Sequence, residues 1–84
     1  MQLQLFISQA FAPCREAERV WQAVATEAGV ALTIVDINSP AGHDIAERLH
    51  VTVVPAVAVD GRLAAIGVQT EEEARALIPA GGAR

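Results

Sequence analysis

Apolar and polar residues along this chain follow two periodicities, one typical of strands and one typical of helices. Residues 2–7 first alternate and then become wholly apolar at residues 5–7, which indicates a central β-strand. From residue 13 to residue 28, apolar side chains recur every three or four positions, and Gly29 follows as a helix stop. Residues 30–37 have the pattern of a second buried strand. Strand, helix and strand in this order predict a right-handed parallel unit.

Two further helices are indicated by their start signals. Ser39 and Pro40 are suited to the N-cap and the first helical position of a short helix that ends near His50. Thr70 and Glu73 have the spacing of a capping box, in which each side chain satisfies a backbone N–H of the other residue. This spacing predicts a third helix immediately after Thr70.

A hairpin is predicted between the second and third helices. Asp60-Gly61 is among the strongest short-turn signals, and it separates the apolar residues 56–59 from residues 62–66. The complete order is β-α-β-α-β-β-α. We therefore expect an α/β protein with one domain over residues 1–84, in which residues 79–84 form a flexible tail.

Composition excludes several classes of partner. The 84 residues carry a formal net charge of −4, and no basic patch is present, so we expect no nucleic-acid partner. No apolar run approaches the ~18 residues of a membrane span, and no signal peptide precedes the first strand, so we expect no membrane partner. The single cysteine, Cys14, cannot form an internal disulfide. This favours a reducing compartment and predicts a cytoplasmic protein.

Cys14 is the main candidate for chemistry. It lies where the first strand leads into the first helix, and free N–H groups at a helix start stabilise a thiolate. The alternative is that Cys14 is a small buried hydrophobe, since free cysteine is among the most buried residue types. The sequence leaves both interpretations open.

The sequence around Cys14 resembles a known family. Pro13-Cys14-Arg15 is similar to the second half of the Cys-x-x-Cys loop of thioredoxins and small glutaredoxin-like proteins, with Phe11 at the position of the first cysteine. Val54-Pro55 resembles the segment in which a cis-proline opens the third strand, and Gly67 is a third match. The resemblance implies a minimal thioredoxin (glutaredoxin-like) fold, with a four-stranded mixed sheet flanked by helices. It also implies that Val54 and Pro55 hold substrate.

Two functions follow from this resemblance. The first is a thiol-redox protein that acts as a monothiol through Cys14, because the lack of a second cysteine excludes a dithiol cycle. Its partners would be protein thiols or disulfides, with glutathione as a candidate co-substrate whose carboxylate Arg15 could bind. The second is a redox-inactive binding module that presents Phe11 and the Pro55 edge to a protein. For either function we expect a monomer or a weak homodimer and no bound cofactor.

The remaining polar residues give weaker signals. His43 and His50 are seven residues apart, and we expect no metal site because such a site needs three or four converging ligands. Asp36 ends the second predicted strand. It is either a partly buried proton acceptor or a residue that caps the following turn, and the second reading agrees better with the usual exposure of aspartate.

Overall fold

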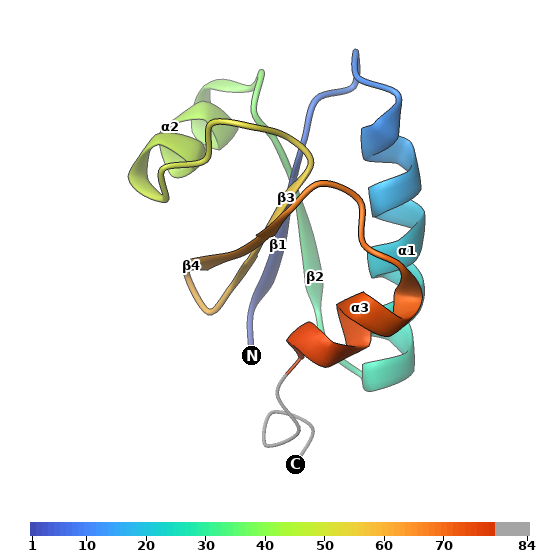
Figure 1. Cartoon of the computed structure of the whole chain (residues 1–84). Coiled ribbons are helices and arrows are strands. Elements are labelled where there is room, and N and C mark those ends of the chain that lie inside the picture. Colours follow the sequence, from blue (N-terminus) through green and yellow to red (C-terminus); the bar gives the residue numbers. More distant parts are fainter. Residues whose placement is uncertain (79–84) are drawn as a thin grey trace.

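A computed structural model describes residues 1–78 of the chain (Figure 1). The elements are β1 (Leu3–Ile7), α1 (Pro13–Ala28), β2 (Leu32–Asp36), α2 (Pro40–Arg48), β3 (Ala56–Val59), β4 (Arg62–Ile66) and α3 (Glu71–Leu77). This order confirms the predicted β-α-β-α-β-β-α arrangement. The expectation of a flexible tail over residues 79–84 lies outside the described residues.

The four strands form one mixed sheet in the order β2-β1-β3-β4. Strand β1 runs parallel to β2 and antiparallel to β3, and β4 is antiparallel to β3. Leu5 in β1 is paired with Ile34 on one side and with Val57 on the other. The prediction that the first strand is central is therefore confirmed.

The interpretation of residues 30–37 as a buried strand is wrong in extent and in burial. Strand β2 spans Leu32–Asp36 and lies at one edge of the sheet, and only Val35 in it is fully buried. An edge strand has a neighbour on one side alone, so its apolar side chains are less enclosed than those of a central strand. The apolar run in the sequence arises because helices cover both faces of the sheet, and this holds for an edge strand as well as for a central one.

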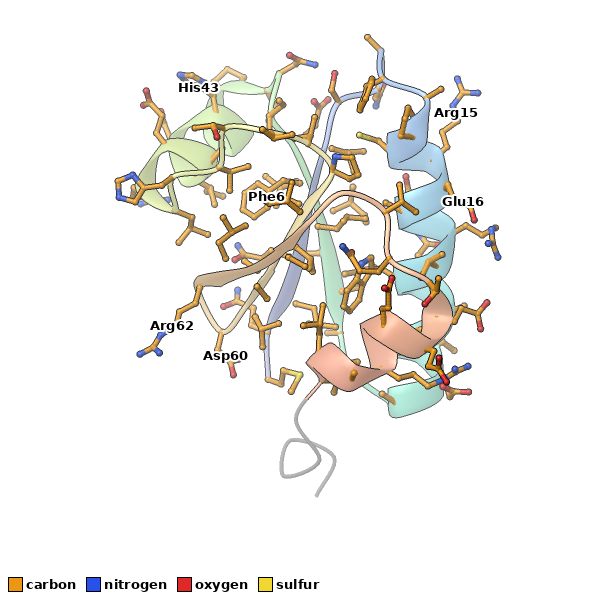
Figure 2. All side chains as sticks on the ribbon, in the orientation of Figure 1. Phe6, Arg15, Glu16, His43, Asp60 and Arg62 are labelled. Carbon is orange, nitrogen blue, oxygen red and sulfur yellow. The ribbon has the colours of Figure 1, made fainter. Side chains whose placement is uncertain are left out.

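Helices cover both faces of the sheet (Figure 1). One core cluster joins Leu5 and Val57 of the sheet to Trp21 of α1 and Ala74 of α3. The other cluster lies on the opposite face, where Phe6, labelled in Figure 2, packs with residues that include Ala46 of α2. Because β1 alternates its side chains between these clusters, it contributes to the core on both faces.

Trp21 connects α1 to the chain that follows β4. Its side chain is fully buried, and its indole N–H donates a hydrogen bond of 3.1 Å to Oε1 of Gln69. The amide group of Gln69 in turn donates to the carbonyl oxygen of Ile66 at 3.2 Å. The buried indole N–H thus has a partner, which avoids the cost of an unsatisfied polar group.

The helix boundaries follow the signals in the sequence. Pro13 is in the first turn of α1, and Gly29 ends that helix with φ of 71°. The Ser39 hydroxyl accepts a hydrogen bond from the Gly42 N–H at 3.0 Å at the start of α2. The capping box between Thr70 and Glu73 is present at the start of α3. All three predicted helix starts are therefore confirmed.

Gly42 allows α2 to pack closely against the end of β2. A Cβ at this position would overlap the carbonyl oxygen of Asp36 and would lie 2.8 Å from Oγ of Ser39. In an open helix, alanine in place of glycine stabilises by about 1 kcal/mol. At this crowded position we expect the opposite sign.

We predict that Gly42→Ala lowers the free energy of unfolding by about 1–3 kcal/mol, as overpacked substitutions do. Asp44→Ala, at an exposed position of the same helix, is the control and should change stability by at most about 0.5 kcal/mol. Urea unfolding followed by circular dichroism measures both. A Gly42→Ala variant that is as stable as the wild type would mean that α2 does not pack against Asp36 as described.

Candidate thiol site

Cys14 lies in the first turn of α1, directly after the loop that leaves β1. Two consecutive backbone turns shape this loop, because the N–H of Phe11 donates to the carbonyl of Ser8 at 3.1 Å and the N–H of Cys14 donates to the carbonyl of Phe11 at 3.0 Å. Only 2 % of Cys14 is exposed, and the residue belongs to the same core cluster as Trp21. The sulfur is therefore held in place by core packing.

The N–H group that contacts the sulfur comes from the loop and not from the helix. The N–H of Ser8 lies 3.4 Å from Sγ of Cys14 and donates to it. At the helix start, by contrast, the N–H groups of Cys14 and Arg15 already donate to the carbonyls of Phe11 and Ala12. A negative charge on the sulfur would be stabilised by the Ser8 N–H, since hydrogen bonds to charged acceptors are stronger than those to neutral ones.

The loop between β2 and α2 supports Ser8. The side-chain amide of Asn38 donates to Oγ of Ser8 at 3.1 Å, and the carboxylate of Asp36 accepts the N–H of Asn38 at 2.9 Å. The N–H of Ile37 also donates to the carbonyl of Ile7 at 3.0 Å. Asp36 thus caps the turn after β2, which agrees with the interpretation of this residue as a turn cap.

An open hollow of about 380 Å³ lies beside Cys14. It is lined by Ile7, Ser8, Gln9, Cys14, Arg15, Glu18 and Ile34. These residues come from the end of β1, the loop that follows it, the first turns of α1 and the edge strand β2. The hollow therefore lies directly beside Cys14, although almost none of this residue is exposed to solvent.

Arg15 lines this hollow and carries a positive charge. Within the part of the chain that the structure describes, no carboxylate lies within 4.0 Å of its guanidinium group. The neighbouring Glu16 instead pairs with Arg19, whose hydrogen bond lowers the pKa of the Glu16 carboxyl. Figure 2 shows Arg15 and Glu16 extending from the first turns of α1.

The other predicted site residues lie outside the lining of the hollow. Phe11 is 48 % exposed, and Pro13 is also exposed. Val54 is half-buried and packs against the core cluster that contains Cys14. Pro55 is buried, the Val54–Pro55 peptide bond is cis, and the carbonyl of Pro55 accepts the N–H of Gly67 at 2.8 Å. The structure thus brings Cys14 and Arg15 together at the hollow and places Val54 against the core beneath.

Sequence reasoning missed Ser8, Glu18 and Ile34 at this site. Glu18 is four residues after Cys14, so the two side chains are neighbours on one helix face. This spacing was the available signal for Glu18. Ile34 depends on the position of β2 beside β1, and no local pattern shows that.

The remaining polar candidates do not extend the site. His43 lies 3.6 Å from a carboxylate oxygen of Glu47, one turn further along α2. Among residues 1–78 no three His, Cys, Asp or Glu side chains are grouped as metal ligands. A search of the same residues finds no helix with the length and apolar character of a membrane span.

Comparison with known proteins places this geometry in a family. A family model described as a thioredoxin domain matches residues 1–79. A relative from Archaeoglobus fulgidus, named Probable Thioredoxin, is 33 % identical over 76 residues, which cover 90 % of this chain and 84 % of the relative. The sheet order, the position of Cys14 at the start of α1 and these two matches agree, and the chain belongs to the thioredoxin family.

Proposed function

We propose that this protein carries out thiol–disulfide exchange as a monothiol through Cys14. The observation that carries the proposal is the position of Cys14, whose sulfur accepts a hydrogen bond from the Ser8 N–H and which is one of the residues that line an open hollow. Membership of the thioredoxin family supports redox chemistry at this position. The proposed partners are protein disulfides or thiols, with glutathione as a co-substrate, in the cytoplasm. We propose that the protein acts as a monomer or weak homodimer.

The proposed exchange balances with a single cysteine. The Cys14 thiolate attacks one sulfur of a disulfide, so that a bond forms between Sγ and that sulfur while the original sulfur–sulfur bond breaks. The leaving sulfur departs as a thiolate and takes a proton from water. Because the chain has no second cysteine, a thiol from another molecule must then attack the mixed disulfide and release Cys14.

Burial of Cys14 means that reaction requires local opening. The loop over residues 8–12 must move away from the sulfur, and the hydrogen bond between Asn38 and Ser8 opposes this movement. Loops at functional sites commonly open at a free-energy cost far below that of global unfolding. The rate at which Cys14 reacts in the folded protein therefore reports on this loop.

We predict that Asn38→Ala speeds alkylation of Cys14 in the folded protein by roughly two- to fivefold, which is the effect of one weakened hydrogen bond. Thr70→Ala is the control, because it removes the cap of α3 far from the loop and destabilises the whole protein by about 1 kcal/mol. Alkylation by iodoacetamide, followed by mass spectrometry, gives the rates. If Thr70→Ala speeds the reaction as much as Asn38→Ala, the thiol reacts through global unfolding and the proposed local opening is wrong.

We predict that the folded protein incubated with oxidised glutathione gains one glutathionyl group, and that Cys14→Ser gains none. The physical reason is that Cys14 carries the only sulfur able to form the mixed disulfide. Intact-mass spectrometry before and after addition of reduced glutathione measures both formation and release of the adduct. A native protein that forms no adduct, under conditions in which the unfolded chain does, would count against the proposal.

A second candidate function is a redox-inactive binding module. The observation that favours it is the exposure of large apolar side chains, with Phe11 at 48 % and Val53 at 53 %. Exposed aromatic residues commonly anchor protein interfaces. The proposed binding surface consists of the Phe11 loop and the edge at Pro55. In this case Cys14→Ala would keep the function in the cell, whereas Phe11→Ala would lose it without a change in stability.

A further inference from the structure

The hollow beside Cys14 combines features suited to a small charged molecule. Its volume of about 380 Å³ lies at the lower end of the range for small-molecule sites. Two isoleucine residues, Ile7 and Ile34, contribute to an apolar wall, and Cys14 also lines the hollow. A volume of this size favours one half of a small disulfide over a segment of a folded protein.

Two opposite charges border the hollow. Among the described residues, Arg15 has no carboxylate partner within 4.0 Å, and the half-buried Glu18 accepts one side-chain hydrogen bond, from the neutral amide of Gln22 at 3.3 Å, and forms no ion pair. Although the two residues are three positions apart on α1, the structure does not pair them. Each charge is therefore available to a ligand.

The hollow also differs in position from the edge at Pro55. None of Phe11, Val54 and Pro55 lines it, and its outer wall includes Ile34 of the edge strand β2. The hollow thus borders the edge strand β2. A ligand in the hollow would leave the exposed Phe11 free.

We infer that the hollow binds a low-molecular-weight disulfide in which each half carries both a carboxylate and an ammonium group, as an amino-acid disulfide does. This inference rests on the proposed function and names its substrate class. Arg15 binds the carboxylate, Glu18 binds the ammonium group, and the carbon chain lies against Ile7 and Ile34. Once the loop over residues 8–12 opens, the Cys14 thiolate attacks the nearer sulfur, forms a mixed disulfide and releases the other half of the molecule as a thiol after protonation by water.

The test compares three disulfides that differ in charge. Cystine carries both groups on each half, cystamine carries only ammonium groups, and 3,3′-dithiodipropionate carries only carboxylates. Rates of mixed-disulfide formation are measured by mass spectrometry for the wild type, Arg15→Gln, Glu18→Gln and a control, Arg62→Gln. Arg62 is exposed on β4, far from Arg15 in Figure 2, and its replacement changes the net charge by the same amount.

Each variant rate is divided by the wild-type rate with the same disulfide, which cancels the intrinsic reactivity of the reagent. Arg15→Gln should slow the reactions with cystine and dithiodipropionate by roughly two- to fivefold more than the reaction with cystamine. This factor corresponds to the usual contribution of an exposed ion pair. Glu18→Gln should slow the reactions with cystine and cystamine by a similar factor more than the reaction with dithiodipropionate. Arg62→Gln should leave all three ratios unchanged.

The outcomes separate the two proposals. If both charge variants change all three rates by the same factor, the charges do not recognise substrate, and the inference is overturned while thiol exchange through Cys14 stands. The same conclusion follows if Cys14 exchanges with a disulfide-bonded protein but these ratios stay at the control value. If the native wild type reacts with no disulfide, small or protein-borne, both the inference and the proposed function are overturned.

Discussion

Packing of the first turn of α1 against the end of β1 is the contact on which the other features of the site depend. It buries Cys14 to 2 % exposure in the core cluster and brings the N–H of Ser8 to 3.4 Å from the sulfur. The same contact sets the position of Arg15 and Glu18 at the hollow. The cysteine is thus both a core residue and the candidate nucleophile, so stability of the closed loop and reactivity of the thiol oppose each other.

Most of the fold could be predicted because its signals are local. Pro13, Gly29, Ser39 and Thr70 mark helix ends through contacts with residues a few positions away, and the structure has each of them in the expected role. The place of β2 in the sheet could not be predicted in the same way. Whether a strand is central or at an edge depends on which strands pair with it, and residues 32–36 have the same apolar pattern in either position.

The candidate site was predicted only around its sulfur. Cys14 and Arg15 could be found because they are adjacent to Pro13 at a recognisable helix start, whereas the hollow itself depends on the gap between α1 and an edge strand. Helical periodicity separates charged from apolar residues, and it therefore favours an outward position for Glu18. It does not show that a charged residue one turn after a buried one can border a cavity.

The proposals place partners on two different sides of Cys14. On one side Val54 packs against the core that holds the thiol, next to the buried Pro55, and the exposed apolar groups at Phe11 and Val53 are suited to a large partner. On the β2 side, the hollow of about 380 Å³ has room for a small molecule. In the proposed exchange the resolving thiol comes from another molecule, since the chain has no second cysteine. Under these proposals, once the loop over residues 8–12 has opened, a small thiol that enters from the β2 side would reach the mixed disulfide without displacing a protein bound at Phe11, so the two surfaces would serve successive steps of one exchange.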